Sequence, residues 1–205
     1  MLPAIVLAAG RSTRMGRAKA LLPLAHGETF LSRVVHTLHD AEVDDIVVVV
    51  GHEPDAIVAD FERRPIPVRF AINHDFDAGQ LTSLLAGLRV VDRPGVVAAL
   101  VTLVDVPLVA ASTVRAVVDR YRRTRAPIVR PVRDGRHGRP VLIDRALFGE
   151  LRAADPAHGS KAVVRAHASA AGDVELDDEG AFRDVDTPEE YARMLAELGR
   201  THLGG

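Results

Sequence analysis

The most informative segment of the chain is VLAAGRSTRMGRAKALLPL (Val6–Leu24). Its apolar start predicts a buried strand that ends near Leu7. Five residues separate Gly10 from Gly16, so the segment matches neither the P-loop nor the dinucleotide fingerprint. Glycines let backbone N–H groups turn toward an anion, and cations and a hydroxyl surround them: Arg11, Ser12, Arg14, Arg17 and Lys19. The segment therefore predicts a site for a highly charged anion such as a nucleoside triphosphate, with a solvated basic turn as the alternative.

Length and composition are those of an ordinary globular domain. The 205 residues are 47% apolar and 26% charged, with a net charge of −2. This balance gives no reason to expect a nucleic-acid or membrane partner, and no stretch approaches the roughly 20 apolar residues of a membrane helix. Without cysteine, disulfides and thiolate chemistry are excluded. We expect a cytoplasmic protein with a single domain over residues 1–205.

Strand and helix patterns alternate along the chain. Nearly continuous apolar runs, typical of parallel strands covered on both faces, occur at Ala4–Leu7, Ile46–Val50, Val68–Ile72 and Val97–Val104. Helical spacing of apolar residues occurs at Phe30–Leu38, Leu81–Val91, Val114–Tyr121 and Tyr191–Leu198. The alternation predicts an α/β fold, and Pro140–Ile143 predicts a short strand at an antiparallel edge. Ligands of such sheets bind beyond the carboxyl ends of the strands, so we expect the site in the loops after Leu7, Ile72 and Val104.

Further motifs follow the first segment in a consistent order. They are NHDFDAGQLTSLLAGL (Asn73–Leu88), LVDVPLV (Leu103–Val109), GRHGRPVLIDRALFGEL (Gly135–Leu151) and DVDTPEEY (Asp184–Tyr191). Together with the first segment, they resemble the nucleotidyltransferases that act on the molybdenum cofactor, most closely the cytidylyltransferase branch. The resemblance implies a three-layer Rossmann-like fold with a mostly parallel sheet. It also implies that residues 1–110 mainly bind the nucleotide and residues 111–205 mainly bind the acceptor.

The resemblance implies transfer of CMP from CTP to the terminal phosphate of molybdopterin, with release of pyrophosphate. An attacking phosphate monoester is already anionic, since its second pKa is about 6, so positioning and charge neutralisation replace a strong base. Lys19 is implied to neutralise the triphosphate, and Arg14 to bind or support the phosphates. The implied nucleotide ligands are Leu7, Ala8, Ala9, Gly10, Arg11, Ser12, Gly16, Asn73, Gly79 and Ser83. For Asn73 and Ser83, a turn asparagine and an ordinary helix serine are the alternatives.

Two aspartates are candidate metal ligands. Asp105 follows an apolar strand, and Asp186 precedes a helix start in which Thr187 is a suitable N-cap, Pro188 a suitable first residue and Glu190 completes a capping box. Asp186 is therefore not needed as the cap. The resemblance implies that both aspartates bind Mg²⁺ or Mn²⁺, with Asp105 also acting in catalysis. The alternatives are a turn aspartate and a charge near a helix dipole.

Base and acceptor choice depend on few residues. Ala9 favours cytosine, because guanine-using relatives tend to carry A-G-G where this chain has A-A-G. The acceptor side is implied to include His137, Gly138, Pro140 and Lys161, although DGRHGRPV (residues 134–141) also fits a solvated hairpin turn. GSKA (residues 159–162) departs from the family's G-D-K-G, which leaves three alternatives: a GTP-using relative, another small phosphorylated acceptor, or a non-catalytic nucleotide-binding or cofactor-delivery protein. A molybdoenzyme or its maturation factor is the implied protein partner.

Overall fold

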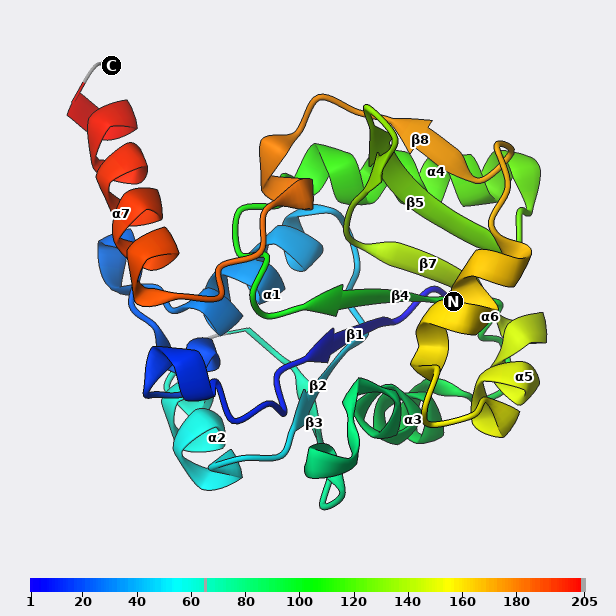
Figure 1. The fold of residues 1–205 in the computed structure, drawn as a ribbon, viewed down its shortest axis with the longest axis horizontal. Helices are drawn as coiled ribbons and strands as arrows, with labels where there is room; N and C mark the ends of the chain where they lie inside the picture. Colours follow the sequence, from blue (N-terminus) through cyan, green and yellow to red (C-terminus); the bar gives the residue numbers. More distant parts are fainter. Residues whose placement is uncertain (65, 204–205) are drawn as a thin grey trace.

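The computed structural model describes residues 1–64 and 66–203, which form a three-layer α/β/α fold (Figure 1). The central sheet has the order β3-β2-β1-β4-β7-β5-β6, with β8 paired to β5. Its strands are β1 (Ala4–Leu7), β2 (Ile46–Val50), β3 (Arg69–Ile72), β4 (Ala98–Leu103), β5 (Ile128–Arg133), β6 (Arg136–His137), β7 (Val141–Asp144) and β8 (Asp173–Glu175). The helices are α1 (Phe30–Asp40), α2 (Pro54–Glu62), α3 (Gln80–Val91), α4 (Ala111–Thr124), α5 (Phe148–Ala153), α6 (Gly159–His167) and α7 (Pro188–Leu203).

The parallel half of the sheet confirms the predicted strands. In β1, Ala4 lies opposite Ile46 of β2 on one side and Leu100 of β4 on the other, all in parallel register. All residues of β1 and β2 are buried, which explains why their apolar runs are continuous. The chain proceeds outward from β1 to β2 and β3, and β4 then pairs with the opposite side of β1. This reversal places a switch in strand order at the carboxyl ends of β1 and β4.

The antiparallel strand near Pro140–Ile143 is present as β7, but it lies inside the sheet. It pairs with β4 on one side and with β5 on the other. Its first three residues are buried, so the apolar pattern reflects an interior position rather than an edge. The antiparallel edge is instead β6, which forms a hairpin with β5. Asp134 and Gly135 at the hairpin tip both have positive φ angles, 49° and 74°, as the Asp-Gly turn requires.

Two apolar cores cover the two faces of the sheet. One core packs α1, α2, α4 and α7 against one face, and Phe30 and Tyr121 are its largest fully buried side chains. The other packs α3, α5 and α6 against the opposite face, around Phe148. Successive residues of β4 alternate between them, since Leu100 belongs to the first and Val101 to the second. No helix of the described residues is both long and apolar enough to cross a membrane.

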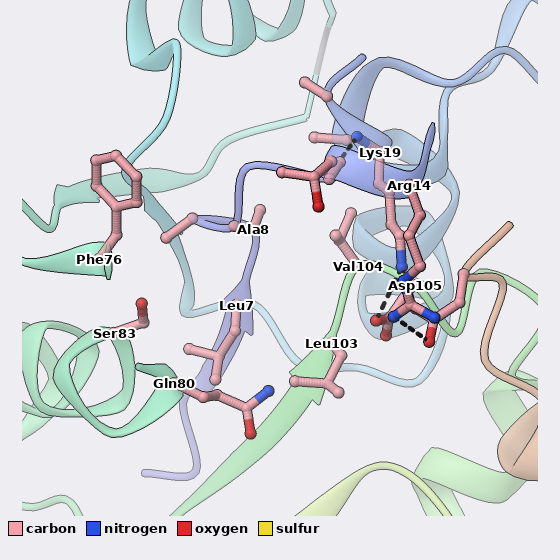
Figure 2. Close-up of a pocket in the computed structure, with 17 residues that line it drawn as sticks. Leu7, Ala8, Arg14, Lys19, Phe76, Gln80, Ser83, Leu103, Val104 and Asp105 are labelled. Atoms are coloured by element: carbon pink, nitrogen blue, oxygen red, sulfur yellow. Dashed lines mark hydrogen bonds and ion pairs between the residues drawn. The ribbon is translucent and has the colours of Figure 1, made fainter. Parts of the chain in front are cut away.

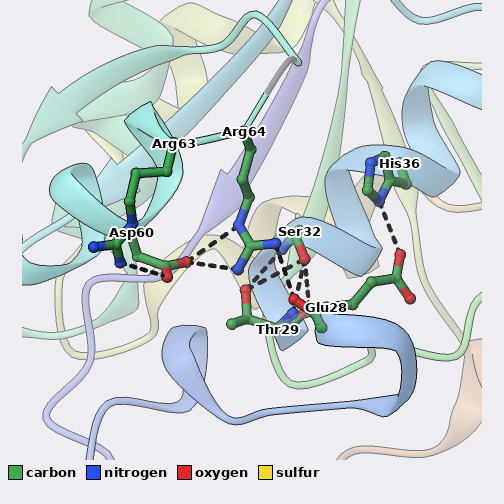
Figure 3. Close-up of polar contacts among 8 residues, drawn as sticks. Glu28, Thr29, Ser32, His36, Asp60, Arg63 and Arg64 are labelled. Carbon is green, nitrogen blue, oxygen red and sulfur yellow. Dashed lines mark hydrogen bonds and ion pairs between the residues drawn. The ribbon is translucent and has the colours of Figure 1, made fainter.

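Polar contacts join Gly27 and Glu28, which follow the first loop, to α1 and to the end of α2 (Figure 3). Glu28 accepts from His36 Nδ1 of α1 at 2.9 Å. Arg64, just after α2, donates to the Asp60 carboxylate at 2.9 Å and to the Gly27 carbonyl at 3.2 Å. These contacts connect the exit of the loop to both α1 and α2, so that the loop is held at each end by regular structure.

Candidate active site

A cavity of about 290 Å³ opens at the carboxyl ends of β1 and β4, where the strand order reverses (Figure 2). In Figure 2, Lys19 and Asp105 lie on one side of the cavity, and Phe76 and Ser83 lie on the other. The lining residues are Leu7, Ala8, Ala9, Gly10, Ser12, Thr13, Arg14, Ala18, Lys19, Ala20, Phe76, Gln80, Ser83, Leu103, Val104, Asp105 and Asp186. One side of the cavity is therefore charged, whereas the side near α3 carries uncharged side chains.

Two residues of the first loop have a left-handed backbone conformation. Ser12 has a φ of 52° and Gly16 a φ of 69°, conformations that a glycine tolerates and most other residues do not. The carbonyl of Ser12 accepts from Met15 N at 2.8 Å. Its hydroxyl accepts from Lys19 N at 3.1 Å. The Ser12 side chain thus braces the loop, and this brace holds the backbone of Lys19 beside the cavity.

Lys19 contacts two carboxylates that lie far apart in the sequence. Its Nζ is 3.4 Å from Asp105 Oδ2 and also donates to Asp186 Oδ1. Arg14 Nη2 donates to the second oxygen of Asp186 at 2.9 Å. The Lys19 side chain is only 11% exposed, so these charges interact more strongly than they would in bulk water. The hydrogen bond from Lys19 and the charges of Lys19 and Arg14 hold the pKa of Asp186 below its usual range.

The chain between the short 3-10 helix η6 (Glu179–Phe182) and α7 brings the acidic residues together. Val185 N donates to the Asp105 carbonyl at 2.8 Å, which places Asp184 and Asp186 on either side of this contact. Loss of water around the Asp184 carboxyl raises its pKa, and the charges of Asp105 and Asp186 raise it further. The site therefore concentrates negative charge in excess of what Lys19 alone neutralises.

These carboxylates fit a divalent cation. Asp105 Oδ1 is buried and has no hydrogen-bond partner among the described residues, although buried polar atoms normally have one. No group of three or more His, Asp or Glu residues in the described part could hold a metal ion. Magnesium is commonly held by one or two carboxylates, with water and substrate phosphates completing its shell. Asp105 and Asp186 would fit that donor set, with water and the phosphates of a nucleotide as the remaining ligands.

The start of α7 positions Asp186. Glu190 Oε2 accepts from Asp186 N at 2.7 Å and from Thr187 N at 3.0 Å. Glu190 N in turn donates to Thr187 Oγ1 at 3.3 Å. This confirms the predicted capping box and the place of Pro188 as the first helical residue. The donated backbone hydrogen bonds, that from Asp186 first, lower the pKa of Glu190.

Several predicted nucleotide ligands lie outside the cavity lining. Arg11 turns away, donating to Asp77 at 2.7 Å with its guanidinium 5.2 Å from the centre of the Phe76 ring. The Asn73 amide donates to Ser83 Oγ at 3.0 Å, and its oxygen accepts from Asp75 N at 3.0 Å, so its polar atoms serve a turn that supports α3. The glycines at 16 and 79 shape the loops without lining the cavity.

A second cavity, of about 460 Å³, contains three of the four predicted acceptor ligands. His137, Gly138 and Lys161 line it, whereas Pro140 is buried beside it in a cis peptide with Arg139. Gln80 lines both cavities. Apart from Gln80 and Asp186, the two linings follow the division between residues 1–110 and 111–205, and the roles assigned to the two parts remain predictions.

Sequence reasoning missed several residues that line these cavities, among them Phe76, Gln80 and Arg139. It also missed Asp184, whose carboxyl interacts with Asp105 and Asp186. Arg139 and Asp184 fall inside motifs that the sequence already contained, GRHGRPV and DVDTPEEY. Phe76 and Gln80 fall inside the segment after β3. No local pattern marks these residues as part of a site, because their positions at the cavities depend on how distant elements pack.

The fold is that of a nucleotidyltransferase. Residues 4–171 match the family described as MobA-like NTP transferase domain, and this chain belongs to that family. It is 30% identical to the nicotine blue oxidoreductase of Paenarthrobacter nicotinovorans over 199 residues, which is 93% of this chain and 95% of that protein. It is 29% identical to the purine catabolism protein PucB of Bacillus subtilis over 195 residues, covering 91% and 92% of the two chains.

Among solved structures, the fold is similar to that of Rv0371c from Mycobacterium tuberculosis H37Rv in complex with manganese. The TM-score is 0.73 at 29% identity, over 95% of this chain and 98% of that one. The manganese belongs to that crystal structure. One relative is named as an oxidoreductase and the other as a protein of purine catabolism, so these names do not specify the substrates of this chain.

Proposed function

We propose that this protein transfers CMP from CTP to the terminal phosphate of molybdopterin or the molybdenum cofactor. The observation that carries the proposal is the position of the Lys19 ammonium, which contacts both Asp105 and Asp186 in the lining of the first cavity. An oxygen of the acceptor phosphate forms a bond to the α-phosphorus of CTP. The bond from that phosphorus to the oxygen bridging to the β-phosphorus breaks, and pyrophosphate leaves with the electron pair.

The principal barrier to this reaction is repulsion between two anions, and the loop side chains address it. In this proposal Lys19 exchanges its carboxylate partners for triphosphate oxygens, and Arg14, which also pairs with Asp186, adds a second positive charge. Because the attacking phosphate oxygen is anionic near neutral pH, no side chain has to remove a proton from it. The residues act by positioning the two substrates and by neutralising charge.

Asp105 and Asp186 are the residues that would hold Mg²⁺ or Mn²⁺. When bound, such a cation supplies charge neutralisation at the phosphates and assists the departure of pyrophosphate. The buried, unpartnered Asp105 Oδ1 supports this role. Glu190 keeps Asp186 in place through the capping box of α7.

The wall next to the loop supports cytosine over the larger guanine. Ala9 lines the cavity and is 3% exposed. A Cβ atom on Gly51 would stand 2.9 Å from Ala9 Cβ and 2.7 Å from Phe76 Cβ, so Ala9, Gly51 and Phe76 are already in close packing. The methyl group of Ala9 therefore cannot move back to make room for a larger base without disturbing this packing.

The test is pyrophosphate release with each of the four nucleoside triphosphates, with and without molybdopterin. We expect release that requires both CTP and molybdopterin. Faster release with GTP would replace the assigned base, and CTP-dependent release with a different phosphorylated acceptor would replace the second substrate. If no triphosphate gives release with any acceptor, the protein is a nucleotide-binding or cofactor-delivery module.

A further inference from the structure

The second cavity carries an excess of positive charge. Arg130, Arg139, Lys161 and Arg165 line it, and none of the described residues in its lining is acidic. Arg130 is neutralised by Asp173, with 2.9 Å between Nε and Oδ1. For the other three cations, no ion pair is found within the described residues. A cavity with several cations and no carboxylate favours an anionic ligand.

One of these cations, Arg139, interacts electrostatically with carboxylates near the first cavity. Its guanidinium is the one whose charge interacts with Asp105 and Asp184 of the first site, although neither carboxylate approaches within ion-pair distance. Lys161 and Arg165 lie on α6, and both are exposed. The lining of the second cavity thus combines Arg139, which interacts with Asp105 and Asp184, with two exposed cations of α6.

The backbone of Arg139 is held firmly. Arg139 N donates to the Ala181 carbonyl at 2.8 Å, and Gly138 N donates to the Pro131 carbonyl at 2.9 Å. A Cβ atom at Gly138 would stand 2.6 Å from the Ala181 oxygen, so glycine is required for this close approach. The β5–β6 hairpin and the η6 segment (Glu179–Phe182) thereby fix the position from which the Arg139 side chain extends.

The Arg139 side chain is costly to bury without a partner. Desolvation lowers the pKa of its guanidinium, and the charges of Asp184 and Asp105 only partly oppose this effect. The group nevertheless stays cationic, because guanidinium is not deprotonated in proteins. A half-buried guanidinium offers a planar fork of donors that suits phosphate and carboxylate oxygens.

We propose that Arg139 binds the anionic group of the acceptor and presents it to the α-phosphate across Gln80, which lines both cavities. This inference rests on the proposed nucleotidyl transfer and specifies the acceptor further. The acceptor is a phosphate monoester whose terminal phosphate contacts Arg139. The body of the acceptor extends toward α6, where Lys161 and Arg165 bind additional negative charge or polar groups.

A titration with inorganic phosphate, followed by the backbone amide NMR signals, tests the proposal without any nucleotide. Amides of Gly138 and Lys161 report on the second cavity, and amides of Gly10 and Ser12 report on the first. We expect Arg139→Gln to weaken phosphate binding at the second cavity at least about tenfold, the loss expected for a hydrogen bond to a charged group. Binding at the first cavity should change less than about twofold.

Two further variants make the result interpretable. Arg136→Gln is the matched control, because Arg136 lies on the same hairpin but faces Glu179 and Phe182 outside the cavity lining, and it should bind phosphate as the wild type does. Arg139→Lys keeps the charge without the fork and should recover part of the affinity. If Arg139→Gln does not fold, a reduced affinity of Arg139→Lys at the second cavity still supports the proposal.

In the transfer reaction, Arg139→Gln should raise the KM for molybdopterin at least about tenfold and leave the KM for CTP within about twofold. The proposal is overturned if Arg139→Gln binds phosphate at the second cavity with wild-type affinity, or if both cavities lose affinity equally. Phosphate binding that depends on Arg139, without pyrophosphate release from CTP and molybdopterin, would retain this inference and reject the assigned substrates.

Discussion

Replacing Lys19 with alanine removes the ammonium group that contacts both Asp105 and Asp186. At the observed 3.4 Å to Asp105, one such pair is worth about 5 kcal/mol of Coulomb energy at an effective dielectric constant of about 20. Desolvation of the three groups offsets most of that energy. We therefore expect a net loss of about 1–3 kcal/mol in the free energy of unfolding, which for a chain of this length lowers Tm by roughly 2–12 °C.

The same substitution should lower turnover far more than stability. Loss of one electrostatic stabiliser typically costs about a hundredfold or more in rate, or about 2.7 kcal/mol of transition-state stabilisation. The assay is pyrophosphate release at saturating CTP and molybdopterin, with thermal unfolding measured in parallel. Because Asp105 and Asp186 are left to repel each other, added Mg²⁺ should raise the Tm of Lys19→Ala more than that of the wild type.

The matched control is Arg17→Ala, which removes a positive charge from the same loop. Arg17 is exposed and does not line the cavity, so its removal should change turnover less than about threefold. Near-wild-type pyrophosphate release from Lys19→Ala would refute the reasoning. An equal loss in both variants would show that the general charge of the loop, rather than the position of Lys19, governs the rate.

Three further substitutions test the site and the fold. Asp105→Asn should lower turnover at least about a hundredfold and weaken Mg²⁺ binding measured by calorimetry; unchanged metal affinity would remove Asp105 from the metal site. Glu190→Ala should lower the free energy of unfolding by about 1–2 kcal/mol, because α7 loses its cap. It should also lower turnover, because Asp186 N loses its acceptor. An unchanged turnover rate would show that the cap does not position Asp186 for the reaction. Hydrogen bonds from two arginines, that from Arg152 first, hold the pKa of Asp92 below its usual range, so its charged form stabilises the fold above about pH 4 and this contribution disappears as the pH falls through the lowered pKa. Asp92→Asn should thus be about 1 kcal/mol less stable than the wild type at pH 7 and equal to it in strong acid, as measured by urea unfolding at both pH values.

Features encoded over a few neighbouring residues were predictable from the sequence. The strands β1 and β2 begin and end where their apolar runs predict. Covered on both faces, such strands need no polar residue in their interior. The capping box of α7 was also predictable, because Thr187, Pro188 and Glu190 act within a single helical turn. The prediction that the first loop binds an anion likewise rested on its own residues, because its cations and glycines lie close together in the sequence.

Only the tertiary structure decided which of these residues meet. Asp105 and Asp186 come together because a backbone hydrogen bond joins Val185 to the end of β4. Arg11, which the loop composition favours as a phosphate ligand, pairs with Asp77 in this structure, and the β5–β6 hairpin places Arg139 in the lining of the second cavity. Local propensity and periodicity are set by neighbours within a turn or a strand pair. The partner of a charged side chain depends on how distant elements pack, and no local pattern in the sequence specifies that packing.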